Sequence, residues 1–169
     1  MTDFRDLADG GRALAQVVGE QPPGTIVLGV VPNGIPGAVE VAQALQLPLM
    51  GVEVERDAAG IVDVRVPDLA GVKRVLLVDD AVETGTAARA VGRVLRKATR
   101  AQTVLAVPVC PRAELASLEV LFDSVVAVVY PLERRSLTWH YDVLAPVPRD
   151  VAYAAIAAHA DALASLADD

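Results

Sequence analysis

The residues best suited to chemistry form one short stretch near the middle of the chain. An apolar run, residues 74–78, ends in two adjacent carboxylates, Asp79 and Asp80. Carboxylate oxygens accept hydrogen bonds from the neighbouring hydroxyls of a sugar, and they are ligands that Mg²⁺ prefers. We therefore expect Asp79 and Asp80 to hold a sugar diol or a magnesium ion.

The loop that follows the acidic pair is suited to an anion. It consists of Ala81, Val82, Glu83, Thr84, Gly85 and Thr86, and helical spacing begins at its last residue. The first N–H groups of a helix have no partners within the helix, and the helix dipole favours negative charge beside them. Gly85 lets the backbone approach an anion closely, and the threonines add hydroxyl donors. A phosphate on one side and a sugar diol on the other describe a ribose 5-phosphate.

The elements that must position these residues alternate between strand and helix. Apolar runs predict buried strands over 25–31, 49–55, 74–78, 103–109 and 124–129. A shorter alternating run at 61–66 predicts an edge strand after a turn. Helices are predicted over 4–18, 38–45, 86–98, 112–121 and 149–166. This order is typical of an α/β protein with a mainly parallel sheet and helices on both faces, in which ligands bind beyond the carboxyl ends of the strands.

The composition limits the kinds of partner. The chain has 169 residues, of which 53% are hydrophobic, and its mean hydropathy is +0.41. This length and apolar content predict a single domain spanning residues 1–169. The net charge of −7 disfavours nucleic acid as a main partner, because an acidic surface repels a phosphate backbone. We expect no membrane span and no signal peptide, and hence a cytoplasmic location.

Other chemistries find little support in the sequence. The single cysteine, Cys110, excludes an internal disulfide and has no catalytic motif around it. The chain has no zinc-binding spacing of Cys and His, no Walker A motif and no dinucleotide-binding glycine pattern. A response-regulator receiver domain is disfavoured, because the strands predicted at 103–109 and 124–129 end without the aspartate that such a domain phosphorylates.

The stretch from Val78 to Ala87 resembles the motif by which type I phosphoribosyltransferases bind phosphoribosyl pyrophosphate (PRPP). Its ending, Gly85-Thr86-Ala87, is similar to the orotate branch of that family, and Glu83 falls where the purine-salvage branch often has an acid. The segments 4–15 and 106–111 also resemble a group of predicted bacterial phosphoribosyltransferases. The resemblance implies the type I phosphoribosyltransferase fold, with a mainly parallel, twisted sheet and a small hood from residues 130–148, the N-terminal segment or both.

The resemblance also implies a reaction, the transfer of ribose 5-phosphate from PRPP to a nitrogenous base with release of pyrophosphate. Asp79 and Asp80 would hold the ribose hydroxyls directly or through Mg²⁺, and the loop 81–86 would hold the 5-phosphate. Glu83 would contact or deprotonate the base. The remaining implied contacts are Asn33, Gly34 and Arg56 with pyrophosphate, and Trp139 and Tyr141 stacked on the base. Homodimers are common in the family, so a homodimer is a further expectation.

One alternative keeps the fold without the turnover. Where the family usually has a basic residue in the loop after the first strand, this sequence has Asn33, which carries no charge. The chain could then be a PRPP-binding regulatory protein or a catalytically degenerate member of the same family. Binding of PRPP without turnover would distinguish this alternative from an enzyme.

Overall fold

The computed structural model describes residues 1–60 and 62–168 and contains one six-stranded sheet in the order β3-β2-β1-β4-β5-β6. The strands are β1 (Thr25–Val31), β2 (Leu49–Arg56), β3 (Val62–Arg65), β4 (Arg74–Val78), β5 (Gln102–Val109) and β6 (Ser124–Val129). β3 pairs with β2 in an antiparallel direction, and all other neighbours are parallel. The predicted α/β class and mainly parallel sheet are confirmed.

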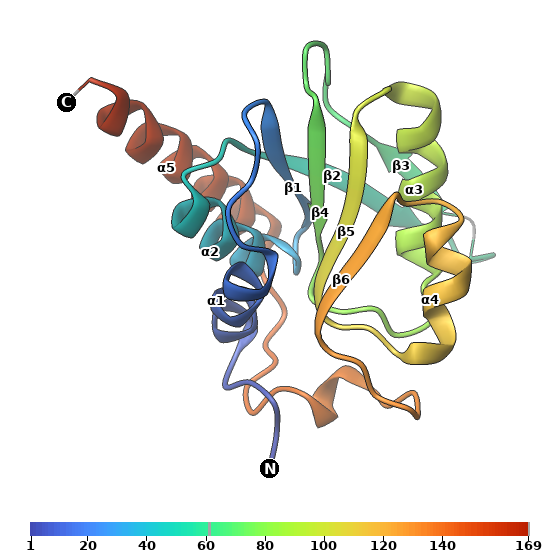
Figure 1. Ribbon diagram of the computed structural model, residues 1–169. Helices are drawn as coiled ribbons and strands as arrows, with labels where there is room; N and C mark the ends of the chain where they lie inside the picture. Colours follow the sequence, from blue (N-terminus) through green and yellow to red (C-terminus); the bar gives the residue numbers. More distant parts are fainter. Residues whose placement is uncertain (61, 169) are drawn as a thin grey trace.

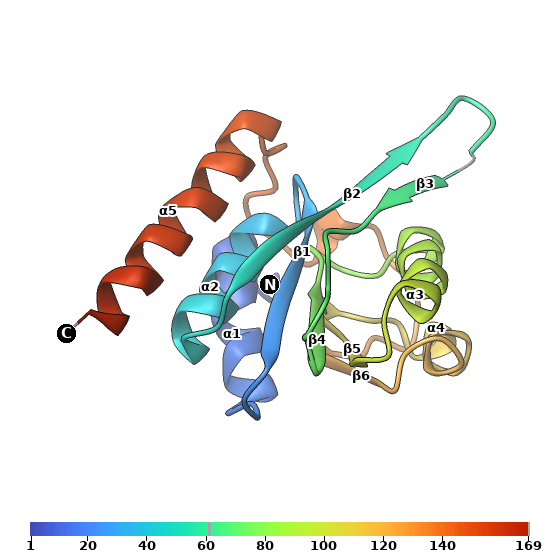
Figure 2. The same cartoon turned by 90° about the horizontal axis from the view of Figure 1, so that it is seen from above.

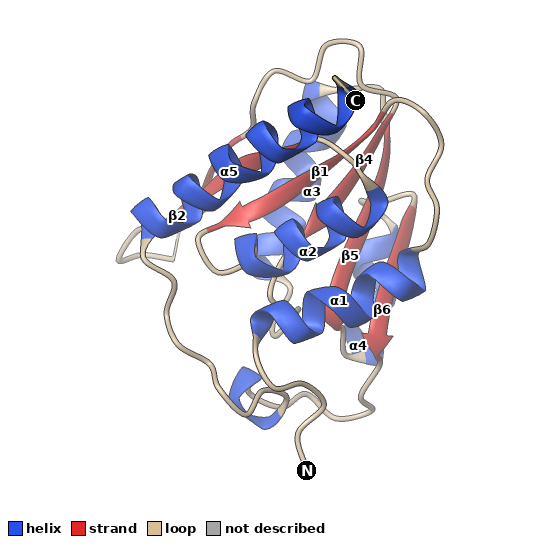
Figure 3. Ribbon diagram, turned by 90° about the vertical axis from the view of Figure 1, so that its left-hand side faces the viewer, coloured by secondary structure: helices blue, strands red, loops and turns tan. Residues whose placement is uncertain are grey.

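Helices cover both faces of this sheet, as predicted. They are α1 (Leu7–Val18), α2 (Ile35–Leu45), α3 (Thr86–Ala98), α4 (Arg112–Glu119) and α5 (Arg149–Ala167), with a short 3-10 helix η1 (Leu137–Trp139). The first, second and fifth helices lie on one face, and α3 and α4 lie on the other (Figures 1 and 3). Seen from above, β2 and β3 extend beyond the other strands as a long hairpin (Figure 2). Among the described residues, no helix is long and apolar enough to cross a membrane.

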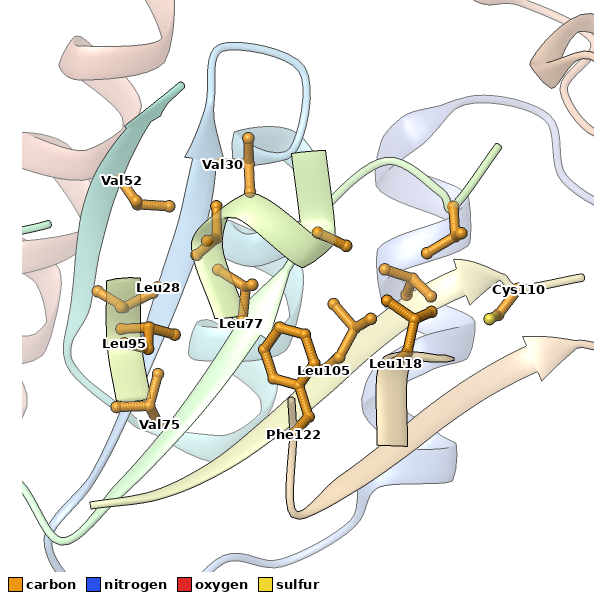
Figure 4. Close-up of a cluster of buried hydrophobic side chains, with 14 of the residues drawn as sticks. Leu28, Val30, Val52, Val75, Leu77, Leu95, Leu105, Cys110, Leu118 and Phe122 are labelled. Atoms are coloured by element: carbon orange, nitrogen blue, oxygen red, sulfur yellow. The ribbon is translucent and has the colours of Figure 1, made fainter. Parts of the chain in front are cut away.

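The continuous apolar runs become strands because both of their faces are buried. On β1, Leu28 and Val30 point into the core under α3 and α4, whereas Val27 points into the core under α1 and α2. Figure 4 shows the first of these cores, with Leu77 and Leu105 from neighbouring strands packed near Leu95 and Phe122 from the α3–α4 side. Successive strand residues face opposite sides, so a central strand covered by helices needs apolar residues at every position.

Several boundaries differ from the prediction by one to three residues; α1 begins at Leu7 rather than at residue 4, and α4 ends at Glu119 rather than at residue 121. α2 begins at Ile35 rather than at residue 38, because Pro36 lies in the first turn, where a missing N–H group costs no helical hydrogen bond. The strand predicted at 61–66 is observed as Val62–Arg65, and residue 61 lies outside the described residues. Its antiparallel position at the edge of the sheet is as expected.

The strand order creates a crevice between β1 and β4. From β1 the chain crosses through α2 to β2 on one side, and from β4 it crosses through α3 to β5 on the other side. The loops after β1 and β4 therefore turn away from each other, and such switch points are where ligands bind in open α/β sheets. The fold thus places the loop after the acidic pair and the loop at Asn33 on the two sides of one crevice.

The segment 130–148, which we call the hood, lies at the carboxyl ends of β5 and β6 and is fastened to the N-terminus (Figure 1). The N–H of Phe4 donates to the carbonyl oxygen of His140 at 2.9 Å, and the N–H of Asp142 donates to the carbonyl oxygen of Phe4 at 3.0 Å. The rings of Phe4 and Tyr141 are 5.5 Å apart and belong to a small apolar cluster with Leu7. Hydrogen bonds and apolar contacts therefore join the hood to the N-terminal segment.

Candidate functional site

A cavity of about 340 Å³ lies beyond the carboxyl end of β4. Its lining brings together most of the predicted site, namely Arg56, Asp79, Asp80, Ala81, Val82, Glu83, Thr84, Gly85 and Thr86, and it adds Ala87, Ala88 and Leu137. Arg56 comes from the end of β2 and Leu137 from the hood, so two other parts of the chain meet the loop after β4 at the cavity. The cavity has room for a ligand of the size of a sugar phosphate.

The acidic pair is held by its own backbone. The Oδ1 atom of Asp79 accepts from the N–H of Asp80 at 2.8 Å, and Oδ1 of Asp80 accepts from the N–H of Ala81 at 2.8 Å. Removal from water raises the pKa of Asp79 well above its ordinary value, and the negative charge of Asp80 raises it further. Removal from water also raises the pKa of Asp80, which the N–H of Ala81 partly opposes. Two carboxyl groups in this state favour a bound cation or hydroxyl donors.

The loop after the pair presents the N-terminus of α3 to the cavity. Gly85 has a φ of +76°, in the left-handed region that favours glycine, and α3 begins at the next residue. The hydroxyls of Thr84 and Thr86 are 3.1 Å apart, and the first turn of α3 contains no acidic residue. A helix N-terminus with hydroxyl groups beside it is a place where proteins commonly bind anions.

The two residues before Glu83 use their N–H groups for the fold. The N–H of Val82 donates to the carbonyl oxygen of Val109 at 2.8 Å, and the N–H of Ala81 donates to Asp80. Neither N–H is therefore directed at a phosphate, although both residues line the cavity. Of the loop 81–86 that is predicted to hold a phosphate, the first two residues thus have N–H groups that are already bonded within the protein.

The two charged side chains at the rim are exposed. Arg56 and Glu83 both line the cavity and are open to solvent. A cation and an anion at the same opening can meet opposite ends of a ligand that carries both a phosphate and a polar base.

The loop after β1 is packed against the acidic pair but does not line the cavity. A Cβ atom on Gly34 would come within 3.0 Å of the Cα of Asp79 and within 2.7 Å of the carbonyl oxygen of Val30, so glycine permits this close approach. The Oδ1 atom of Asn33 accepts from the N–H of Val147 at 3.0 Å. Asn33 therefore anchors the segment that leads to α5, a role that the sequence did not indicate.

The structure corrects the base-stacking role predicted for Tyr141. The side chain is 2% exposed, its ring packs on Phe4, and its hydroxyl donates to the carbonyl oxygen of Asp80 at 2.6 Å. Burial raises the pKa of the Tyr141 phenol, so this hydroxyl stays protonated and remains a donor. A ring enclosed in this way has no open face for a base.

Trp139 remains open but lies elsewhere. It is 62% exposed, and the guanidinium of Arg135 lies 5.1 Å from its ring centroid. It lines a second cavity, of about 760 Å³, between the hood and residues 1–3. The structure does not bring Trp139 to the cavity of Asp79 and Asp80, and the hood residue that does line that cavity is Leu137. No sequence motif marked Leu137.

Comparisons with known proteins show the family and the fold of this chain. The family model of the phosphoribosyl transferase domain matches residues 5–126, and the chain belongs to this family. The structure is similar to that of TT1426 from Thermus thermophilus, with 22% identity, 92% of this chain and 98% of that chain covered, and a TM-score of 0.74.

Two phosphoribosyltransferases of known specificity share the fold. Adenine phosphoribosyltransferase from Rhodothermus marinus is 19% identical, over 72% of this chain and 77% of its own, with a TM-score of 0.56. Orotate phosphoribosyltransferase from Aeropyrum pernix is 28% identical, over 70% of this chain and 68% of its own, with a TM-score of 0.51. The fold is therefore that of type I phosphoribosyltransferases, and the similar structures include enzymes for both purine and pyrimidine acceptors.

Proposed function

We propose that this protein is an enzyme that binds PRPP in the cavity after β4 and transfers its ribose 5-phosphate to a nitrogenous base. The observation that carries the proposal is one cavity in which the carboxylates of Asp79 and Asp80 lie beside the N-terminus of α3. Carboxylates next to a phosphate site are unfavourable unless they face another part of the ligand. The neighbouring hydroxyls of a ribose satisfy that requirement.

Different residues of the cavity bind different groups of PRPP in this proposal. Asp79 and Asp80 accept hydrogen bonds from the ribose hydroxyls, and the first turn of α3 with Thr84 and Thr86 holds the 5-phosphate. In the reaction the bond between the anomeric carbon and pyrophosphate breaks, and a bond from that carbon to the base nitrogen forms. The proton lost by the nitrogen passes to Glu83, whose exposed carboxylate stands at the opening of the cavity.

Pyrophosphate, the leaving group, needs cations and donors. Arg56 supplies the nearest positive charge on the cavity wall, and the amide NH₂ group of Asn33 is the donor available from the loop after β1. Positioning and charge stabilisation are the main tasks of the protein in such a displacement.

The donor set fits Mg²⁺ if the substrate brings part of the coordination. Among residues 1–60 and 62–168, no group of three His, Cys, Asp or Glu side chains gathers to hold a metal. Mg²⁺ is usually bound by one or two carboxylates together with waters and substrate phosphates, so Asp79 and Asp80 are the residues that would hold it. When bound, Mg²⁺ would neutralise charge on the departing pyrophosphate.

A second candidate function is PRPP binding without turnover. The specific observation in its favour is that Asn33 is uncharged and that its side-chain Oδ1 atom already accepts a hydrogen bond from the N–H of Val147. The expectations of one domain, a cytoplasmic location and a possible homodimer belong to either version of the proposal. Neither version involves nucleic acid.

The first test is a calorimetric titration with PRPP in the presence of Mg²⁺. We expect saturable binding by the wild type and its loss in the Asp79→Asn/Asp80→Asn variant. A variant with Asp161→Asn and Asp168→Asn changes the net charge equally on α5 and its end, away from the cavity, and should bind as the wild type does. A folded wild type that gives no heat with PRPP would overturn the proposal. If PRPP binds, release of pyrophosphate in the presence of at least one of a panel of nucleobases would identify an enzyme, and binding without release would favour the regulatory protein.

A further inference from the structure

Arg89, on α3, contacts the loop of the acidic pair from the side away from the cavity. Its Nη2 atom donates to the carbonyl oxygen of Thr84 at 2.7 Å, and its Nη1 atom donates to Oε2 of Glu114 at 2.9 Å. A further bond from Nη1 reaches Oγ of Ser117 at 3.2 Å. Glu114 and Ser117 lie on α4, which covers the same face of the sheet as α3 (Figure 1). The side chain of Arg89 thus joins the loop to two helices, and it is not among the residues that line the cavity.

The bond to Thr84 fixes the direction of one peptide group. The peptide between Thr84 and Gly85 is trans, so its carbonyl oxygen and its N–H point in opposite directions. Because the guanidinium of Arg89 holds the carbonyl oxygen on the side of α4, the N–H of Gly85 points the other way. Gly85 lines the cavity, so this N–H is aimed at the place where the 5-phosphate is proposed to bind.

A glycine loop needs such a restraint more than other loops do. Gly85 has a φ of +76° and no side chain to limit its backbone, and α3 starts directly after it. A carbonyl oxygen turned toward the phosphate would replace a favourable contact by a repulsive one. A peptide that is fixed before the ligand arrives also lowers the free energy needed to order it on binding.

The ion pair with Glu114 limits the electrostatic attraction of Arg89 for a phosphate. The side chains of Arg89 and Glu114 are only 25% and 20% exposed, and each carries one unit charge of opposite sign. The pair therefore presents little net charge to the phosphate. The contribution of Arg89 is orientation of the loop, not attraction of the anion.

The geometry points to Arg89, braced by Glu114, as a positioning residue that sets the Thr84–Gly85 peptide for binding the 5-phosphate. This inference rests on the proposed function and adds a part of the machinery that no binding motif contains. The inference predicts an effect on the 5-phosphate end of the substrate and none on the pyrophosphate end, because Arg89 contacts the loop beside α3. The site for pyrophosphate, at Arg56 and Asn33, has no contact with it among the described residues.

The test measures the two ends separately, by titrating ribose 5-phosphate and Mg²⁺-pyrophosphate into the wild type, Arg89→Met and Arg89→Lys. We expect Arg89→Met to weaken ribose 5-phosphate binding about tenfold, the loss that one charge-assisted hydrogen bond corresponds to. Pyrophosphate binding should stay unchanged. Arg89→Lys keeps a donor without the planar fork and should recover part of the loss. Arg93→Met, an exposed arginine one turn further along α3, is the matched control and should change neither affinity.

Each outcome bears on a different claim. A wild type that binds neither ligand overturns the proposed function and this inference with it. Equal ribose 5-phosphate affinity in the wild type and Arg89→Met overturns the inference alone. An equal loss for both ligands would mean that Arg89 only supports the fold, which also overturns it. If Arg89→Met does not fold, Arg89→Lys alone carries the test, and a smaller but still selective loss for ribose 5-phosphate is expected, since the lysine keeps the charge beside Glu114 but not the planar fork.

Discussion

The loops after β4 and β1 flank the same crevice, but they are attached to the protein in opposite ways. The loop after β4 is held from behind, through Val82 by β5 and through Tyr141 by the hood, so its polar side chains remain free to face the cavity. The loop after β1 is itself a point of attachment, since Asn33 holds the chain before α5 and Gly34 packs on the backbone beside it. The side chains of the loop after β4 are thus free because other residues hold that loop in place, whereas the Oδ1 atom of Asn33 in the loop after β1 is already used for attachment.

The largest expected difference between the loops comes from replacing a glycine by alanine in each. At Gly34 the new Cβ atom would lie 2.7 Å from the carbonyl oxygen of Val30 and 2.9 Å from that of Val78, and backbone at the centre of the sheet cannot move aside. We expect Gly34→Ala to lower the free energy of unfolding by about 3 kcal/mol. At Gly85 the closest atom is the end of the flexible Arg89 side chain, so the positive φ dominates and the cost is about 1 kcal/mol.

Urea unfolding of both variants measures this difference. Equal losses would mean that the two loops are packed alike and would remove the contrast between them. Gly60→Ala serves as a control for positive φ alone, because nothing lies within 4 Å of its new Cβ atom.

The framework of the two loops could be predicted from the sequence, but their attachments could not. The strands at 25–31, 74–78 and 124–129 have the predicted bounds, because a run that is apolar at every position after its first residue has few other places to be buried. The acidic pair could be placed at the end of such a strand for the same reason. Local pattern therefore specifies which residues reach the crevice.

Contacts between distant parts of the chain carry no local pattern. Tyr141 bonds to a residue 61 positions earlier, and Asn33 to one 114 positions later. From the sequence, Tyr141 could either stack on a base or support the loop after β4 from the protein interior. The packing of its ring against Phe4, which the sequence does not show, decides for the second role. Arg89 was unmarked in the same way, because an arginine on a helix is most often exposed to solvent.

The next comparison separates the two roles of Asn33, attachment and ligand binding. Asn33→Ala removes the acceptor for the N–H of Val147 and should lower the free energy of unfolding by about 1 kcal/mol. Asn33→Asp keeps an oxygen acceptor, so its loss of stability should be smaller. Its negative charge replaces the amide NH₂ group, however, and should weaken the binding of Mg²⁺-pyrophosphate. Two variants that are equally unstable, or an Asn33→Asp variant that binds pyrophosphate normally, would contradict this division of roles.

The smallest expected effect is a dependence on pH that only the loop after β4 can have. The pKa of Asp79 is raised above its ordinary value of 3.8 by removal from water, and that of Asp80 is raised for the same reason. The folded protein therefore binds protons at this pair more tightly than the unfolded chain does. The free energy of unfolding must then fall as pH rises from the ordinary carboxyl pKa through the raised one, because charging the pair is costly only in the folded state.

Urea unfolding across this pH range should show the fall in the wild type and not in Asp79→Asn/Asp80→Asn, after subtraction of the pH dependence that both proteins share. The loss caused by Asn33→Ala should be the same at every pH, since an amide does not titrate. A wild type that follows the double variant at every pH would mean that the acidic pair is as well hydrated as a surface pair. The difference between the loop after β1 and the loop after β4 would then lie only in their hydrogen bonds to the rest of the protein.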